Sequence, residues 1–175
     1  MSFKTIRTAM LGVAAMVLGA AMTTTSASAA EATLTGVHNC CNSCKKGIDA
    51  AVTGAGAKAK IDKSTITVTA DDEAGVKKAV AALMAAGYFG EGAPAAAAAA
   101  PAAPSDAKAK SVTVEGVHLC CGKCVDAFNK AVKTAAGATK TDAAKNAKTV
   151  VVEGDVSPKE VLDALHKAGF NASVK

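Results

Sequence analysis

The stretch Gly36-Val-His-Asn-Cys-Cys-Asn-Ser-Cys44 decides how this chain is organised, because it recurs as Gly116-Val-His-Leu-Cys-Cys-Gly-Lys-Cys124. These two segments hold all six cysteines and two of the three histidines of the 175-residue chain. A shorter repeat follows each of them, as Gly87-Tyr88 and Gly169-Phe170. Self-similarity at a nearly constant offset is typical of duplicated units. We therefore predict two copies of one small module, at residues 31–92 and 111–175.

The hydrophobic periodicity of the first copy alternates between strand and helix spacing. It predicts, in order, a strand at Thr33–Val37, a helix from Asn42, strands at Ala57–Asp62 and Thr65–Ala70, a helix that ends at Gly87, and a closing strand at Tyr88–Glu91. This order is βαββαβ, the split βαβ arrangement of ferredoxin-like domains. The predicted fold class is α+β, with two such domains.

The second copy repeats this order with clearer boundaries. Thr149–Glu153 is its strongest predicted strand, and Ser157-Pro158-Lys159-Glu160 combines an N-cap serine with proline at the first helical position. Gly169 is expected to end that helix, and Phe170–Val174 to form the final strand. Each copy has only about 60 residues, which is near the lower limit for an independent core. We expect no large catalytic cleft in so small a module.

Residues 1–29 have the pattern of a cleaved export signal. Lys4 and Arg7 precede an uncharged apolar run from Ala9 to Met22, and Ala27-Ser28-Ala29 supplies small residues for cleavage. The run is shorter than the roughly 20 apolar residues that span a bilayer. We therefore expect a periplasmic or secreted protein with no membrane span after signal cleavage.

Residues 93–110 are expected to form a linker between the two modules. Pro94, Pro101 and Pro104 surround a run of six alanines, and prolines prevent a long helix there. A tether of this kind keeps two sites at a high effective concentration.

The composition argues against nucleic acid as a partner. Arg7 is the only arginine and lies in the predicted export signal, and the chain has only four phenylalanines, one tyrosine and no tryptophan. Arginine is the preferred bidentate reader of phosphate and guanine, and aromatic side chains stack on bases. The lysines are expected to form a solvated surface.

The cysteines are spaced for chemistry at a helix start. Cys41 and Cys44 lie three residues apart where the first helix begins, as do Cys121 and Cys124 in the second copy. A helix N-terminus favours the thiolate, the form that binds metal. Cys40 and Cys120 lie on the preceding loops and can reach the same sites.

Metal binding is the preferred interpretation of these clusters, with two alternatives. One alternative is a duplicated interaction module with structural disulfides, which are common in exported proteins, but each module has an odd number of cysteines. A thiol–disulfide redox protein is the enzymatic alternative, although no tryptophan precedes the motif. The sequence shows no hydrolytic triad, phosphate-binding loop or carboxylate pair, so we predict that the protein is not an enzyme and has no catalytic residues.

The three histidines differ in context. His38 and His118 recur at the same position before Cys-Cys-x-x-Cys, so we treat both as candidate ligands or hydrogen-bonding groups at the metal site. His166 lies on a predicted helix without a motif partner and is expected to be solvated.

The βαββαβ order, with Cys-x-x-Cys opening the first helix and Ile48 or Phe128 four residues beyond its second cysteine, resembles the heavy-metal-associated domain family. That family includes copper chaperones, modules of metal-pumping ATPases and a periplasmic mercury-binding protein. The resemblance covers both modules and implies that Cys41 with Cys44, and Cys121 with Cys124, bind a soft ion. If such a protein passes its ion on, the expected partner is a metal-transporting or acceptor protein.

Two departures from the family pattern affect the expected site. Val37 and Val117 occupy the place of the family's methionine, and the loop before Cys-x-x-Cys is two residues longer. The added cysteine and histidine allow three-thiolate coordination or a Cys₃His site. Two or three thiolates suit Cu(I), mercury or cadmium, and three thiolates with one imidazole suit zinc. We favour Cu(I), with zinc second, in a protein that sequesters the ion or passes it on.

Overall fold

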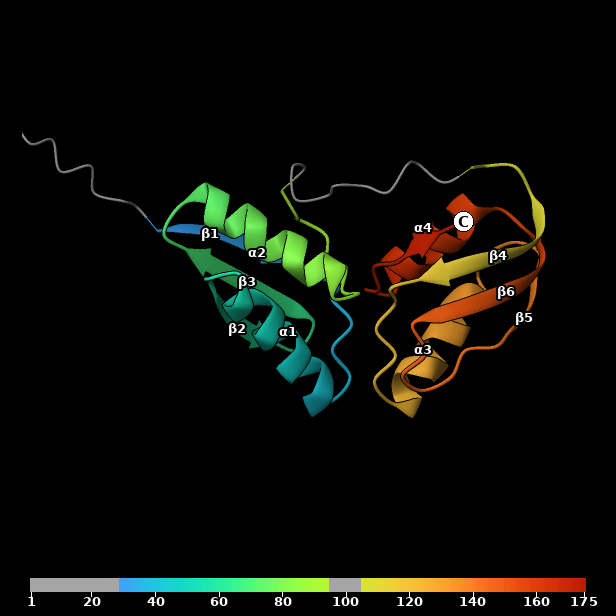
Figure 1. Ribbon diagram of the computed structural model, residues 1–175, viewed down its shortest axis with the longest axis horizontal. Helices are drawn as coiled ribbons and strands as arrows, with labels where there is room; N and C mark the ends of the chain where they lie inside the picture. Colours follow the sequence, from blue (N-terminus) through green and yellow to red (C-terminus); the bar gives the residue numbers. More distant parts are fainter. Residues whose placement is uncertain (1–28, 95–104) are drawn as a thin grey trace, which may run out of the picture.

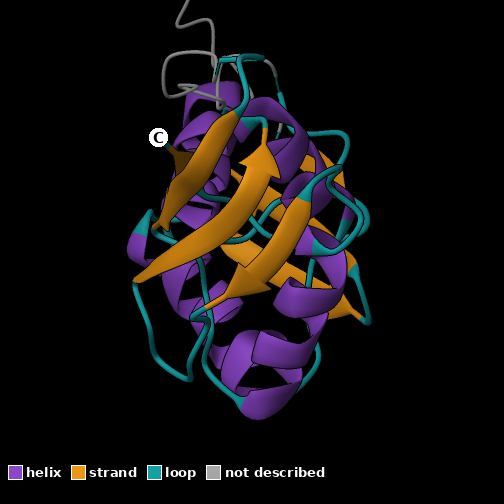
Figure 2. Ribbon diagram, turned by 90° about the vertical axis from the view of Figure 1, so that its right-hand side faces the viewer, coloured by secondary structure: helices purple, strands orange, loops and turns teal. Residues whose placement is uncertain are grey.

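The structure is a computed structural model that describes residues 29–94 and 105–175. Residues 1–28 of the predicted export signal, and the alanine run of the predicted linker, lie outside the described residues. Each described segment forms one module with a sheet and two helices, and the two modules lie side by side (Figure 1). In the view turned by 90°, the strands of the nearer module cross in front of the helices (Figure 2). The predicted α+β class is confirmed.

The first module contains three strands and two helices. They are β1 (Ala30–Leu34), α1 (Asn42–Gly54), β2 (Lys58–Asp62), β3 (Thr65–Ala70) and α2 (Glu73–Ala85). The sheet order is β1-β3-β2, and both pairings are antiparallel. Ile66 and Val68 of β3 are fully buried, as their alternation predicts. The first strand begins three residues earlier than expected.

The second module contains four strands and two helices. They are β4 (Ala109–Glu115), α3 (Gly122–Val132), β5 (Ala138–Thr141), β6 (Thr149–Val156), α4 (Pro158–Lys167) and β7 (Ser173–Val174). The sheet order β5-β6-β4-β7 is that of a ferredoxin-like domain. The Oγ of Ser157 accepts a hydrogen bond from the Glu160 N–H at 3.4 Å, so the predicted cap of α4 is confirmed. The final strand is shorter than Phe170–Val174.

The expected closing strand of the first module, Tyr88–Glu91, does not form as a strand. Glu91 makes an isolated antiparallel bridge with Thr35 of its own module, whereas Tyr88 bridges to Phe170 of the second module. Gly90 packs directly against Leu34 and Val37, where a Cβ atom would lie 2.7 Å from each side chain. The segment therefore divides its backbone hydrogen bonds between the two modules instead of continuing one sheet edge.

Backbone hydrogen bonds join the modules on either side of that bridge. The carbonyl of Gly169 accepts from the N–H of His38 at 3.2 Å and from that of Phe89 at 3.0 Å. The Asn171 N–H donates to the carbonyl of Gly87 at 2.9 Å. Gly87 and Gly169 have positive φ angles, 91° and 80° respectively. Each lies against the backbone of the other module's cysteine loop, so a side chain has no room at either position. The turn after each second helix thus docks on the opposite module.

The buried side chains of the two modules form one continuous cluster. Its members include Leu34, Ile48 and Leu83 of the first module and Phe128, Leu165 and Phe170 of the second, all 1% exposed or less. Val37 and Val117, each just before the histidine of a cysteine loop, are also buried. Among the described residues, no helix combines the length and apolar character that crossing a membrane requires.

Candidate metal centre

Two cysteines of each module are placed by the start of its first helix. Cys41 is the N-cap residue of α1 and Cys121 that of α3, both with extended backbone. Cys44 and Cys124 lie one turn further along and are fully buried. Because residues three apart share one side of a helix, the two sulfurs of each pair lie 3.7 Å apart in α1 and 3.5 Å apart in α3.

The third cysteine of each module joins this pair from the preceding loop. The Cys40 sulfur lies 3.8 Å from that of Cys44, and the Cys120 sulfur lies 3.5 Å from that of Cys124. All six cysteines are free thiols in the structure. Each module therefore contributes three converging sulfur atoms, as the sequence predicts for the loop cysteines.

The two sulfur groups also meet each other, which the sequence did not predict. Across the modules, the Cys40 sulfur lies 3.7 Å from that of Cys121 and 3.5 Å from that of Cys124. The Cys44 sulfur lies 3.5 Å from that of Cys120 and 3.7 Å from that of Cys124. Cys41 and Cys120 complete the contacts at 3.8 Å. The six thiols thus form one cluster at the junction of the modules.

The environment of the thiols separates their proton affinities. The backbone N–H of Cys44 lowers the pKa of the Cys41 thiol to about 6, and the N–H of Cys124 lowers the pKa of Cys121. Burial raises the pKa of Cys124 to about 11 and also raises the pKa values of Cys40 and Cys120. Cys40, Cys120 and Cys124 therefore retain their protons until a cation displaces them, whereas Cys41 is largely ionised at neutral pH, so metal binding at the three protonated thiols is coupled to proton release.

The two candidate histidines pack on aromatic rings of the opposite module. His38 stacks on Phe170 with ring centroids 4.2 Å apart, and His118 packs against Tyr88 at 4.7 Å. Burial lowers the pKa of both imidazoles, that of His38 to about 4. A ring nitrogen of His38 lies within 4.8 Å of the sulfurs of Cys40, Cys44 and Cys124, so His38 can reach the cluster.

His118 is placed differently from His38 relative to the sulfurs. Within the parts of the chain that the structure describes, His118 belongs to no group of potential ligands of this kind. The Nε2 atoms of both histidines are buried without a hydrogen-bond partner. The reciprocal packing gives both side chains a place at the module junction, and their role at the metal stays a prediction.

His166 is not solvated as expected. Its ring lies parallel to that of Phe89 in the first module, with centroids 3.8 Å apart and an interplanar angle of 5°. Beside it, the side-chain amide of Asn171 donates to the carbonyl of Met84 at 2.9 Å. Phe89 and Asn171 were missed, and the contact of His166 was not foreseen, because no motif marks these residues. The repeated Gly87-Tyr88 and Gly169-Phe170 pairs were the available signal for this surface.

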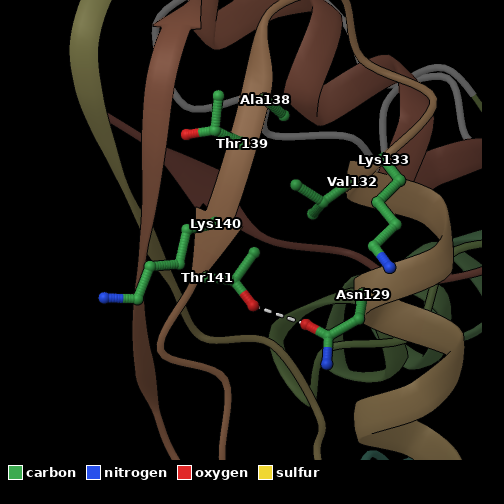
Figure 3. A pocket seen from close by; sticks show the side chains of 7 residues that line it. All are labelled: Asn129, Val132, Lys133, Ala138, Thr139, Lys140 and Thr141. Carbon is green, nitrogen blue, oxygen red and sulfur yellow. Dashed lines mark hydrogen bonds between the residues drawn. The ribbon is translucent and has the colours of Figure 1, made fainter.

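The surface depression in Figure 3 is not a competing centre for this chemistry. The depression in Figure 3 has a volume of about 220 Å³ and is lined by residues of α3 and β5. Thr141 donates a hydrogen bond to the side-chain oxygen of Asn129 across it, and Lys133 and Lys140 are the charged groups of its lining. This lining carries neither a thiol nor a carboxylate.

Comparisons with known proteins agree with the metal-binding interpretation for the second module. Residues 111–171 match the heavy-metal-associated domain family. The resemblance predicted from the sequence is therefore confirmed for that module. Among solved structures, the N-terminal soluble domains of Bacillus subtilis CopA match with 18% identity and a TM-score of 0.32, covering 85% of this chain and 95% of that chain. No curated protein matches the sequence.

Proposed function

We propose that this protein is an exported, two-module carrier of a soft metal ion, with Cu(I) the preferred cargo and zinc second. The observation that carries the proposal is the convergence of six free thiols, at sulfur–sulfur distances of 3.5–3.8 Å, where two helices begin. Thiolates bind Cu(I), and also mercury and cadmium, more readily than hard cations. The match of residues 111–171 to the heavy-metal-associated domain family supports the same cargo class.

The placement of the thiols supports transfer as well as storage. Cys40, Cys41, Cys120 and Cys121 are each partly exposed, whereas Cys44 and Cys124 are buried. An incoming thiolate from an acceptor protein can therefore attack an ion at the exposed side and replace ligands one at a time. A metal-transporting protein or another acceptor is the partner that this chemistry requires.

Anaerobic titration of Cu(I), and separately of Zn²⁺, into the fully reduced chain tests the proposal. We expect tight binding of Cu(I) in competition with a chromophoric Cu(I) chelator. We expect fewer Cu(I) ions bound per chain in a Cys41→Ser/Cys44→Ser variant. Ser43→Ala is the matched control, because Ser43 is exposed between the two ligands and carries no sulfur. Unchanged stoichiometry in the double cysteine variant would overturn the proposal.

The redox alternative makes a different prediction for the same thiols. A thiol with a lowered pKa beside a second thiol, as at Cys41 and Cys44, is also the arrangement of a disulfide-exchange enzyme. Such an enzyme would accelerate reduction of insulin disulfides, whereas a metal carrier would not. The reduction potential of the Cys41–Cys44 pair distinguishes the two chemistries independently of any substrate.

Export is tested by the mature N-terminus. Cleavage after Ala29 leaves a chain that begins at Ala30, the first residue of β1. We expect mass spectrometry of the protein from the periplasmic or secreted fraction to give that mass. Recovery of the full-length chain from the cytoplasm alone would contradict it.

A further inference from the structure

We infer that the two modules do not bind metal independently, but build one polynuclear Cu(I)–thiolate centre between them. This inference rests on the proposed function and specifies its site. The argument begins with the arrangement of the six sulfur atoms. Nine sulfur pairs are separated by 3.5–3.8 Å, and five of those pairs cross from one module to the other. Contacts between modules are therefore as short as contacts within them.

The sulfurs can be grouped into four triads whose members all lie within 4.8 Å of one another. The triads are Cys40–Cys44–Cys124, Cys40–Cys41–Cys121, Cys41–Cys44–Cys120 and Cys120–Cys121–Cys124. Every cysteine belongs to two of these triads, and the first three triads draw on both modules. One ion held by each triad would use every sulfur as a bridge between two ions. The arrangement thus accommodates about four three-coordinate ions on six thiolates.

The sulfur–sulfur distances support this coordination over the two-thiolate linear geometry. With a metal–sulfur bond of about 2.3 Å, sulfurs on opposite sides of a linear ion lie about 4.6 Å apart, whereas those on a three- or four-coordinate ion lie about 3.8–4.0 Å apart. The Cys41–Cys44 and Cys121–Cys124 separations of 3.7 Å and 3.5 Å match the higher coordination. A linear ion in either pair would require the sulfurs to move apart.

Charge favours several monovalent ions in the same space. Six thiolates around two Cu(I) ions leave a net charge of about −4, whereas around four they leave about −2, and burying excess charge is costly. Cys44 and Cys124 are fully buried at the middle of the cluster, so this cost applies there. Three-coordinate monovalent ions shared by bridging thiolates are typical of Cu(I) and not of tetrahedral zinc.

The module junction outside the cluster is already formed to hold this centre. The His38–Phe170 and His118–Tyr88 contacts and the backbone bonds at Gly87 and Gly169 bring the two cysteine loops together without any sulfur. Each module alone holds only three of the six sulfurs. The centre is therefore incomplete without the second copy of the motif.

Native mass spectrometry of the reduced full-length chain during anaerobic Cu(I) titration tests the inference. We expect one chain to pass from the metal-free form to about four Cu(I) with little population of one- and two-copper species. X-ray absorption at the copper edge should show three sulfur neighbours and a copper–copper scattering path. Two copper ions that load one after another without that path would overturn the inference but leave the proposed function intact. No copper binding at all would overturn both.

Variants of one module give a second test. Cys120→Ser/Cys121→Ser/Cys124→Ser removes every sulfur of the second module and none of the first. A shared centre predicts that this variant loses the multi-copper form, whereas independent modules predict that it keeps one full-affinity site. Circular dichroism tests whether the variant folds. If it does not fold, the titration of the wild-type chain alone distinguishes a shared centre from independent sites. A four-copper species that forms only in a dimer of the protein would also overturn the inference.

Discussion

Gly47 of α1 leaves room for the side chain of Tyr88, which follows α2. A Cβ at this position would collide with the hydroxyl of Tyr88, which donates a hydrogen bond to the carbonyl of Cys44 at 3.1 Å. The second module has Ala127 and Phe170 at the equivalent positions, where no hydroxyl needs the space. The two positions therefore differ together between the modules: glycine accompanies the tyrosine in the first module, and alanine accompanies the phenylalanine in the second.

We expect Gly47→Ala to destabilise the protein by about 1–2 kcal/mol, because overpacking outweighs the gain in helix propensity. Adding Tyr88→Phe should recover most of this loss by removing the colliding atom. Urea denaturation of the reduced, metal-free chain measures both variants. Ala127→Gly serves as the matched control and should lose only about 0.5–1 kcal/mol. Additive effects of Gly47→Ala and Tyr88→Phe would contradict the argument.

His166 gives the stability of the protein a dependence on pH. Burial against Phe89 lowers the pKa of the imidazole, so the unfolded chain takes up a proton at a higher pH than the folded one. Stability from this residue is complete above the ordinary histidine pKa of about 6.5 and falls as the pH decreases below it. We expect the urea midpoint to decrease between pH 7.5 and 5, and to decrease less in His166→Gln. Equal pH dependence in both proteins would count against this role.

At the scale of the elements, the described helix α2 depends on its cap. The side chain of Asp72 accepts a hydrogen bond from the Gly75 N–H at 2.7 Å, and Glu73 adds negative charge in the first turn. Asp72→Ala should cost about 1 kcal/mol, whereas Asp72→Asn keeps the acceptor and should cost less. Thermal unfolding of the two variants measures the difference. An Asn variant as unstable as the Ala variant would show that the cap bond is not what matters.

The elements that were predicted from sequence are those whose signal is local. β3 was predicted with its observed bounds because Ile66 and Val68 alternate with threonines, and α4 was predicted because its start has Ser157 and Pro158. The closing strand at Tyr88–Glu91 was not observed because its two ends have different partners: Glu91 bridges to Thr35 of its own module, whereas Tyr88 bridges to Phe170 of the other module. No periodicity within one copy contains that information.

The same limit applies to the candidate site. The repeated cysteines were enough to predict that three thiols of each module converge, since Cys-x-x-Cys at a helix start fixes two of them. The meeting of Cys44 with Cys124 depends on how the modules dock, which nonlocal contacts determine. His118 was treated as a candidate ligand or hydrogen-bonding group because of the repeat alone, and the structure shows that its ring packs against Tyr88 of the other module.

At the scale of the whole molecule, the Phe89–His166 stack is a probe of docking that avoids every cysteine. The two rings come from different modules and lie 3.8 Å apart. In a double-mutant cycle with Phe89→Ala and His166→Ala, we expect a coupling energy of about 0.5–1.5 kcal/mol in the reduced chain above pH 7. A coupling near zero would mean that the modules separate in solution without metal.

Both halves of the sulfur cluster belong to one polypeptide, connected through residues 93–110. In a pair of identical single-module subunits, the same six ligands would assemble only when two subunits associated, and dilution would favour the separate subunits. Here the meeting is an intramolecular event whose probability does not change with the amount of protein. A cell that makes only a few copies would therefore retain the same avidity per molecule as one that makes many.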